Sequence, residues 1–450
     1  FIDDLNLPRM LHIAFVRSDH AHARILEIDS ADAAAKPGVA AIFTAPDIAG
    51  LWNPIRATSR MADYHATELP VLAHDKVRYV GEAVVAVVAE NRYLAEDAAE
   101  QIMVSYEPLG DAIDAIANAK ADAPLLHDDA GTNVLAARTF HRGDVDAALA
   151  EASVRVSGNF RMHRKTPTAM ENRGYVADYD PGRRALTLHS TTQIPGIVRD
   201  ALVEMLDIPG NRLRVVAPDV GGGFGGKGAL YPEEVLVCII ARQLGRPVKW
   251  LSDRLEDLMT TNQAFDEHVA AELACDGEGH ILGLRAEVIG DVGAYSVYPW
   301  TAAIEPVQVV SFLPGPYRVP NYLGRVRAVA TSKTPTGAYR GVGRPISTFV
   351  MERLMDMAAA KLSLDPLEMR RRNMVQADEF PYKTASGIVW DRAGFMECLD
   401  KVASSYESLR RDQTAARAQG RWVGIGLASY AELTGLGSRI AVAPGMPVNT

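Results

Sequence analysis

The sequence is poor in cysteine, because Cys238, Cys275 and Cys398 are the only three among its 450 residues. They lie far apart, so they provide neither the paired spacing of a zinc or iron-sulfur site nor an even-numbered disulfide framework. Cys238 falls in an apolar stretch and is expected in the core. Sparse, unpaired cysteine fits a reducing compartment, and we expect a cytoplasmic protein.

The chain also has no excess of positive charge. The chain has 47 Lys and Arg against 56 Asp and Glu, a formal net charge of -9, and no basic cluster that could neutralise phosphates. This composition argues against a nucleic-acid partner. The sequence shows no signal peptide and no apolar run long enough to span a membrane, although it begins with Phe1 rather than Met. With 48% hydrophobic and 23% charged residues, we expect two or three globular domains.

Two common catalytic signatures are absent. The histidines include no pair at i, i+4 spacing around a glutamate, which is the mark of a zinc hydrolase. The sequence also lacks the Gly-x-Ser-x-Gly elbow that exposes a nucleophilic serine. Zinc-dependent hydrolysis and serine-based acyl transfer therefore have no candidate residues.

What the sequence does contain is a glycine loop between a strand and a helix. The strand is predicted over 213–216 and the helix after Tyr231, and six glycines lie within the eight residues 221–228. Glycine permits positive φ and lets a ligand approach the bare backbone. The loop alone leaves three interpretations open: a phosphate loop, a dinucleotide fingerprint and a structural turn. The phosphate-loop interpretation lacks the Ser or Thr that binds magnesium, because Gly228 follows Lys227.

The distribution of apolar, polar, glycine and proline residues divides the rest of the chain into a compact first part, a connection and a larger second part. Short apolar strands and one helix alternate up to residue 112, and residues 113–135, rich in Ala, Asp and Pro, are typical of a surface connection. Strands separated by glycine and proline turns follow from residue 136, and two helices come after Arg340. The second of these helices is expected to begin with Asp365 as its cap. The predicted strands are 10–16, 39–43, 84–88, 152–160, 185–190 and 269–274.

Three distant segments together resemble one family. They are Thr191-Thr192-Gln193, Gly222-Gly223-Phe224-Gly225-Gly226-Lys227 and the stretch 337–345, Gly-Ala-Tyr-Arg-Gly-Val-Gly-Arg-Pro. In this combination the chain resembles the molybdopterin-binding large subunit of the xanthine dehydrogenase and aldehyde oxidase family. Residues 16–18, 77–82 and 365–373 are also similar to that family, so the resemblance covers nearly all of the chain.

The resemblance implies an α+β fold in which an α/β hammerhead domain (1–112) and a linker (113–135) precede the first molybdopterin-binding domain (136–450), which ends at the start of the second. It implies a molybdenum-dependent hydroxylase that inserts water-derived oxygen into an N-heteroaromatic compound or an aldehyde. The implied cofactor is molybdenum-molybdopterin, with the cytosine dinucleotide among its forms. Electrons would pass to a [2Fe-2S] small subunit and an FAD-binding medium subunit. The general-base glutamate is expected outside this segment, in a second molybdopterin domain on the same or another chain.

The resemblance also assigns cofactor residues. Gln193, Phe224 and Arg340 would surround the metal, and Gly222, Gly223 and Gly225 would present backbone to the pterin. Taken alone, each of the first three has another interpretation. Gln193 could cap the helix that begins near Ile197, Phe224 could fill the core, and Arg340 could hold a carboxylate.

Three positions depart from the purine-oxidising members of the family and define an expected substrate pocket. Gly228 stands where those members have a glutamate, Val342 where they have an aromatic residue, and Gln308 near the place of an arginine. Without these anchors xanthine is disfavoured as the substrate. Gly341 and Val342 also replace the cysteine and serine of carbon monoxide dehydrogenases. A noncatalytic scaffold subunit and a nucleotide-binding protein that uses the loop at 221–228 are the alternative functions.

Overall fold

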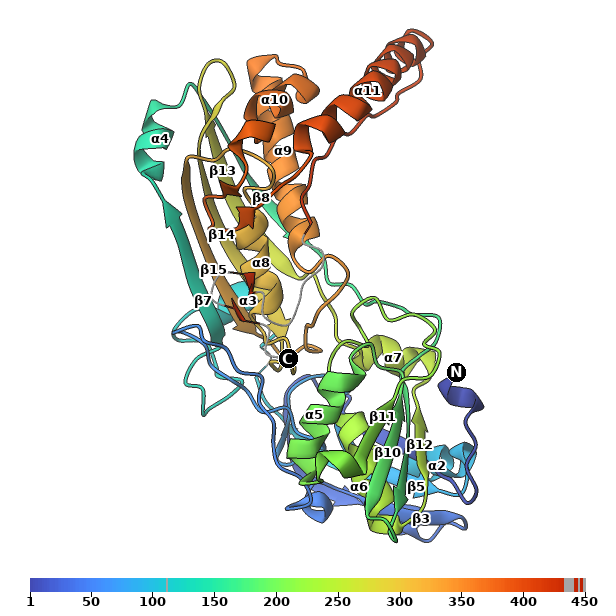
Figure 1. The fold of residues 1–450 in the computed structure, drawn as a ribbon. Helices are drawn as coiled ribbons and strands as arrows, with labels where there is room; N and C mark the ends of the chain where they lie inside the picture. The colour runs from blue at the N-terminus through green and yellow to red at the C-terminus, as the bar shows by residue number, and fades with distance from the viewer. Residues whose placement is uncertain (111, 433–440, 444–445, 448–450) are drawn as a thin grey trace.

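The computed structural model describes residues 1–450 except 111, 433–440, 444–445 and 448–450. Two large sheets and the helices that cover them form the body of the molecule, and a long helix projects from one end (Figure 1). The expected start of a second domain at 448–450 lies outside the described residues. No helix in the described part of the chain combines the length and apolarity needed to cross a membrane.

A seven-stranded sheet joins the N-terminal part of the chain to the later part. Its order is β11-β10-β9-β12-β1-β5-β3, and β1 pairs in parallel with β12 through Leu11 and Val248. One sheet therefore crosses the expected boundary between the first two domains. The strands are β1 (Leu11–Arg17), β3 (Val39–Phe43), β5 (Ala83–Ala89), β9 (Gly174–Asp180), β10 (Ala185–Ser190), β11 (Leu213–Val216) and β12 (Val248–Leu251).

The sequence of β5, Ala-Val-Val-Ala-Val-Val-Ala, is apolar throughout because both of its faces are buried. Ala86 and Val88 belong to the core that includes residues of α5 (Pro195–Leu206) and α6 (Pro232–Leu244). Val85 and Val87 belong to the opposite core, together with residues of α2 and the small sheet β4-β2-β6. The bounds on that side are α1 (Ala31–Ala34), α2 (Arg92–Ala99), β2 (Ala23–Asp29), β4 (Lys76–Val77) and β6 (Met103–Pro108).

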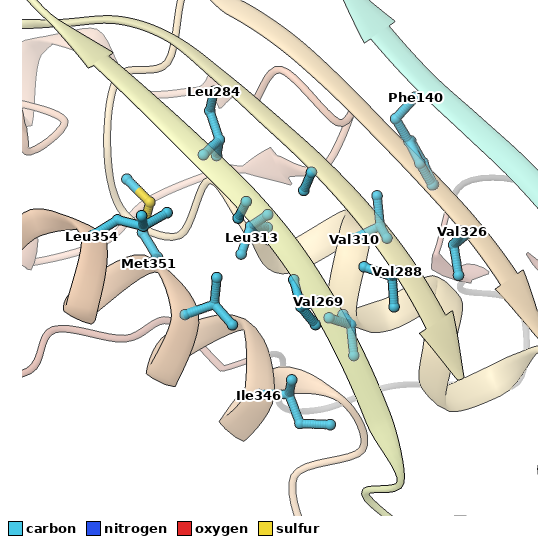
Figure 2. Packing of buried hydrophobic residues seen from close by; sticks show 14 of the residues in the cluster. Phe140, Val269, Leu284, Val288, Val310, Leu313, Val326, Ile346, Met351 and Leu354 are labelled. Atoms are coloured by element: carbon cyan, nitrogen blue, oxygen red, sulfur yellow. The ribbon is translucent and has the colours of Figure 1, made fainter. Parts of the chain in front are cut away.

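The second sheet has five strands in the order β7-β15-β14-β13-β8, and helices α8 (Ile304–Phe312) and α9 (Arg344–Leu362) cover one of its faces. Figure 2 shows apolar side chains from strands and helices meeting between these layers, among them Val269, Val288 and Met351. Met351 and Met355 are buried and belong to this core. The strands are β7 (Val134–Arg142), β8 (Val154–Met162), β13 (Glu267–Cys275), β14 (Ile281–Gly293) and β15 (Asn321–Ala330).

The remaining helices lie around these layers. Asp365 caps α10 (Pro366–Asn373), as predicted, because its Oδ1 accepts the N–H of Leu367 at 2.8 Å. The long helix α11 (Phe395–Ala418) projects from the sheet (Figure 1). The other elements are α3 (Ala115–Asn118), α4 (Val145–Glu151), α7 (Arg254–Thr260) and the short strand pairs β16 (Tyr382–Lys383) with β17 (Val389–Trp390) and β18 (Ala441–Ala443) with β19 (Met446–Pro447).

The segment 113–135 has mostly exposed or partly exposed residues, with a few buried ones that anchor it. Asn118, Leu126 and His127 are buried, and the Asn118 side chain donates to the carbonyl oxygens of Ala112 and Ala330 at 2.8 and 3.1 Å. These bonds attach the segment to the five-stranded sheet.

Candidate functional site

The glycine loop follows β11 and precedes α6, as the sequence predicts. Gly222, Phe224 and Gly225 have φ of +96°, +53° and +98°, so three residues of the loop adopt left-handed backbone. A phenylalanine pays a steric penalty there that glycine avoids. The Phe224 side chain is 45% exposed, so the interpretation that it fills the core is wrong.

Gln193 lies against this loop. Its Oε1 accepts the N–H of Gly225 at 2.9 Å, and its own N–H donates to the carbonyl oxygen of Lys227 at 2.9 Å. The helix α5 has Ile194 at its N-cap and no side-chain cap, so the capping interpretation of Gln193 is wrong. Because the Gly225 N–H requires an acceptor, the amide oxygen of Gln193 faces the loop. Its Nε2 remains without a partner among the residues that the structure describes.

The segment around Arg340 closes the other side of the loop. The Arg340 N–H donates to the carbonyl oxygen of Phe224 at 3.0 Å. A Cβ on Gly225 would lie 2.9 Å from the Cα of Tyr339, so the two loops touch. The Arg340 side chain is exposed, and no carboxylate of the described residues pairs with it. Three segments that are distant in sequence therefore meet through their main chains, as the sequence analysis expects.

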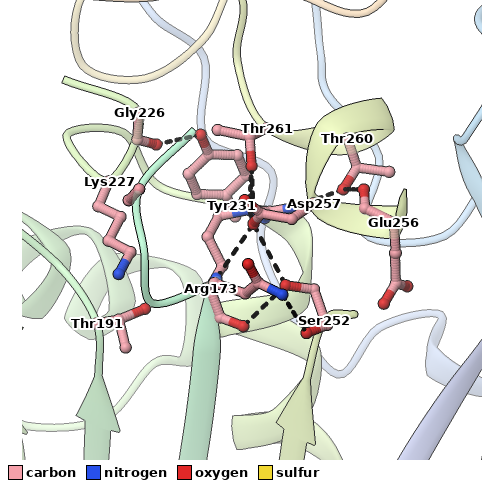
Figure 3. Close-up of polar contacts among 12 residues, drawn as sticks. Arg173, Thr191, Gly226, Lys227, Tyr231, Ser252, Glu256, Asp257, Thr260 and Thr261 are labelled. Atoms are coloured by element: carbon pink, nitrogen blue, oxygen red, sulfur yellow. Dashed lines mark hydrogen bonds and ion pairs between the residues drawn. The ribbon is translucent and has the colours of Figure 1, made fainter. Parts of the chain in front are cut away.

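A buried polar network supports these loops from below (Figure 3). The Tyr231 hydroxyl donates to the carbonyl oxygen of Gly226 and accepts the N–H of Asn262 at 3.1 Å. The side chain of Asn262 in turn lies against Gly337, where a Cβ would be 3.0 Å away. One phenol thus connects the glycine loop to the segment that leads to Arg340.

Arg173 holds this phenol in place. Its guanidinium carbon lies 4.0 Å from the centre of the Tyr231 ring, and its side chain is 1% exposed. It donates to Glu233 at 3.2 Å, to Thr261 at 2.9 Å and to Thr260 at 2.5 Å. Burial alone would raise the pKa of Glu233, but Arg173 and Arg17 outweigh it and hold that pKa below its usual value.

Lys227 points inward, away from any external phosphate. Its Nζ donates to Glu171 Oε2 at 3.0 Å, and its side chain is 3% exposed. The same Glu171 oxygen accepts the N–H of Gly221 at 2.7 Å. Burial lowers the pKa of Lys227, and Glu171 opposes this change. The lysine therefore ties together the two ends of the glycine loop, which removes the main support for the phosphate-loop interpretation.

The three expected pocket residues lie in different surroundings. Val342 is half-buried and has φ of +42°. Gly228 is buried, and its carbonyl oxygen accepts the indole N–H of Trp300. Gln308 is 1% exposed, and its Oε1 accepts a guanidinium N–H of Arg344. The polar groups of Gly228 and Gln308 are thus engaged within the chain, and the contact of all three positions with a substrate stays a prediction.

Sequence reasoning missed the supporting residues Glu171, Arg173, Tyr231 and Asn262. The Tyr231-Pro232 pair at the start of a helix is a visible local signal. A single buried arginine gives none, because its partners come from separate elements of the chain. Within the described ranges, no group of three or more His, Cys, Asp or Glu side chains is placed to hold a metal ion.

Two protein-family models match the chain. Residues 126–374 match the molybdopterin cofactor-binding domain, and residues 1–110 match the a/b hammerhead domain of aldehyde oxidase and xanthine dehydrogenase. The hammerhead domain followed by a molybdopterin-binding domain confirms the predicted fold class.

Individual relatives agree with these matches. The chain is 36% identical over 438 residues to the nicotine 6-hydroxylase large subunit of Paenarthrobacter nicotinovorans, covering 97% of this chain and 53% of that protein. It is 30% identical over 403 residues to the nicotinate dehydrogenase large molybdopterin subunit of Eubacterium barkeri, covering 89% and 91%. The structure of quinoline 2-oxidoreductase from Pseudomonas putida 86 superposes with a TM-score of 0.96 at 38% identity, covering 100% of this chain and 57% of that one.

The chain thus spans about half the length of the nicotine 6-hydroxylase subunit and nearly all of the nicotinate dehydrogenase subunit. Both family models and these relatives indicate the same protein family. The chain belongs to the xanthine dehydrogenase and aldehyde oxidase family of molybdopterin-binding large subunits.

Proposed function

We propose that this chain is the cofactor-binding part of a molybdenum hydroxylase that inserts water-derived oxygen into an N-heteroaromatic compound. The observation that carries the proposal is the meeting of Gln193, the Phe224-Gly225 backbone and the Arg340 backbone at one exposed place. The quinoline, nicotine and nicotinate enzymes among its relatives support the substrate class. An aldehyde is the second candidate substrate.

The residues present fit a molybdenum-molybdopterin cofactor. The N–H groups of Gly223 and Phe224 and the Nε2 of Gln193 have no acceptor within the described part of the chain. A Cβ on Gly222, Gly223 or Gly225 would meet Phe224, the Gln193 side chain or the main chain of Ala338, so these glycines let the loop pack closely enough to present its free N–H groups. When bound, the cofactor supplies the oxygen that is inserted and accepts the electron pair from the substrate. The free donors would hold its oxygen atoms, and Gly225 fixes which way the Gln193 amide points.

The pocket positions favour an uncharged aromatic ring. Gly228 offers no side chain, Val342 is apolar, and the Gln308 oxygen already accepts a hydrogen bond from Arg344. A xanthine ring would lose its charged anchors at these places, and unpaired polar groups in a closed pocket are costly. We infer that quinoline-like or pyridine-like rings are better substrates than xanthine.

The proposed complete enzyme contains more than this chain. We propose a second molybdopterin-binding domain that supplies the general-base glutamate, a [2Fe-2S] subunit and an FAD-binding subunit. The large-subunit names of the relatives support such a complex. The cytosine dinucleotide is the proposed form of the pterin.

Replacement of Gln193 tests the function. The purified complex is expected to contain molybdenum and to oxidise quinoline or nicotinate faster than benzaldehyde or xanthine. Gln193→Ala removes the free donor, so turnover should fall by about 100-fold while the fold is retained, as expected when one electrostatic donor is lost. Elemental analysis, steady-state kinetics and circular dichroism measure these effects, and Gln376→Ala, in a segment remote from the glycine loop, is the matched control.

The other functional classes give different results. A noncatalytic scaffold would contain no molybdenum, and Gln193→Ala would change nothing. A nucleotide-binding protein would bind ATP in a magnesium-dependent manner, which the burial of Lys227 against Glu171 argues against.

A further inference from the structure

Two buried carboxyl groups meet between the five-stranded sheet and the helix that covers it. Glu267 is the first residue of β13 and Glu305 lies in the first turn of α8, and each is 2% exposed. Gly290 lies opposite Glu267 in the sheet, and a Cβ there would be 2.7 Å from Glu267 Oε2 and would overlap the ring of Pro306. The glutamate of the strand and the first turn of the helix therefore share one narrow space.

Neither carboxyl group forms an ion pair with a Lys, Arg or His of the described residues. Nearby, Asp266 and Asp291 are neutralised by Arg164, at 3.0 and 2.8 Å, and by Lys333, at 3.3 and 2.6 Å. This leaves no described cation paired with Glu267 or Glu305. Within the part of the chain that the structure describes, Oε2 of Glu267 and Oε1 of Glu305 also lack a hydrogen-bond partner.

Two adjacent ionised carboxylates without a cation are strongly disfavoured in a protein interior. Burial raises the pKa of Glu305 to about 7. Burial, and then the charge of Glu305, raise the pKa of Glu267 well above its usual value. The pair therefore keeps at least one proton at neutral pH.

The pair lies directly beneath an unusual turn. Gly341, Val342 and Gly343 have φ of +100°, +42° and +73°, so three successive residues are left-handed. A β-branched residue is rarely found in that region, so surrounding contacts must hold Val342 there.

Glu305 supplies such contacts. A Cβ on Gly343 would lie 2.6 Å from the carbonyl oxygen of Glu305, and the backbone of Gly343 lowers the pKa of the Glu305 carboxyl against the larger effect of burial. Glu305 Oε2 also accepts the N–H of Phe265 at 2.8 Å. Phe265 packs edge to face on Tyr339, with ring centres 5.1 Å apart. Glu305 thus connects the entry to β13, helix α8 and the turn.

We propose that Glu267 and Glu305 form a buried carboxyl pair that is not ionised at acid pH and keeps at least one proton at neutral pH, and that this pair positions the Gly341–Gly343 turn and with it Val342. That Val342 then shapes a substrate pocket rests on the proposed function. The charged groups that face the pair are Asp266 from the β13 entry, Asp291 from β14, Arg164 from the segment after β8 and Lys333 from the segment after β15, and on α9 Arg344 pairs with Glu432.

Ionisation of the pair should loosen the Gly341–Gly343 turn as pH rises. Glu305 has a folded-state pKa above its ordinary value, so its contribution to stability is complete at acid pH and is lost as pH rises through about 7. Loss of the Glu305 proton leaves a buried negative charge beside Glu267, and no described cation pairs with it. The turn above them then loses its fixed support.

Glu305→Gln tests the proposal in the full-length protein without substrate. The amide keeps the shape of the side chain and its acceptor oxygen but cannot ionise. Infrared spectra of the wild type at pH 7 should show the carbonyl band of a protonated carboxylic acid, and this band should weaken in Glu305→Gln. Hydrogen exchange of amides 341–346, corrected for its intrinsic pH dependence, should rise about tenfold from pH 6 to pH 9 in the wild type and stay constant in the variant.

Glu352→Gln is the matched control, because Glu352 is also a buried carboxyl with a raised pKa but pairs with Arg370, away from the turn. It should keep the pH-dependent exchange of the wild type. The proposal is overturned if the wild type lacks the protonated-acid band, or if exchange of the turn has the same pH dependence in the wild type and Glu305→Gln.

Kinetics separates this proposal from the proposed function. With quinoline as the probe, Glu305→Gln should remove the rise in KM above pH 7 and leave kcat within a few-fold of the wild type. If the protein contains no molybdenum but the infrared and exchange results hold, the proposed function fails and the protonated carboxyl pair stands. If turnover occurs but those two results are absent, the positioning pair fails and the function stands.

Discussion

Replacement of Arg173 by methionine is expected to lower the free energy of unfolding by about 3 to 5 kcal/mol, the usual effect of removing one partner from a buried ion pair. The variant leaves Glu233 and Asp257 in the interior without their main cation. It also removes the cation from the face of Tyr231, whose hydroxyl holds Gly226. We therefore expect the purified variant to contain little molybdenum, as measured by elemental analysis, and to unfold at lower urea concentration.

The control for this prediction is Arg199→Met. Arg199 forms an ion pair with Asp200 that is 40% and 69% exposed, so its loss should change stability by less than about 1 kcal/mol. Equal destabilisation by the two variants would contradict the role given to Arg173.

The effect of Arg173→Met should also depend on pH. Arg173 and Arg17 hold the pKa of Glu233 below its usual value against the opposing effect of burial. A carboxyl with a lowered folded-state pKa stabilises the protein above its unfolded pKa, and this contribution disappears as pH falls through the folded pKa. The difference in stability between wild type and variant should therefore shrink in acid. A difference that is constant from neutral to acid pH would show that lost packing, rather than lost charge pairing, dominates.

Local patterns in the sequence predict the elements that present the site. The strand before the glycine loop, the helix after Tyr231 and the cap at Asp365 all follow from short-range preferences, and each is found where expected. Gln193 shows the limit of such reasoning. Its position shortly before a proline favours capping of the next helix. In the structure, however, its side-chain oxygen accepts the N–H of Gly225 instead. That competition arises only after the chain has folded.

The supporting structure could not be predicted from one sequence. The pairing of β1 with β12 joins residues from opposite sides of the expected domain boundary. Arg173, Tyr231 and Asn262 come from three separate segments, and only Tyr231, next to Pro232 at a helix start, has a local signal. Main-chain strain at Phe224 and Val342 is likewise invisible in residue types, because both are poor choices for left-handed backbone. These features depend on long-range contacts.

Gly225→Ala should abolish cofactor binding, because it drives the glycine loop and the Arg340 segment apart. An added Cβ would lie 2.7 Å from the carbonyl carbon of Ala338 and 2.9 Å from the Cα of Tyr339, and both are main-chain atoms that cannot rotate away. The residue also has φ of +98°, which alanine adopts at a cost of roughly 1 to 2 kcal/mol. Displacement of donors by about 1 Å can reduce a rate by about 100-fold. We expect at least that loss of turnover, together with a lower molybdenum content.

Gly131→Ala separates the effect of the main-chain contact at Gly225 from the conformational cost of positive φ in alanine. Gly131 also has positive φ, +66°, but a Cβ there would meet no atom of the described residues within 4 Å. This variant should lose about 1 kcal/mol of stability and keep the molybdenum content and turnover of the wild type. Any excess effect of Gly225→Ala then measures the need for the two loops to touch. If Gly225→Ala retains both molybdenum and turnover, the main-chain contact between Gly225 and the Arg340 segment is not what forms the site, and the cofactor must be held elsewhere.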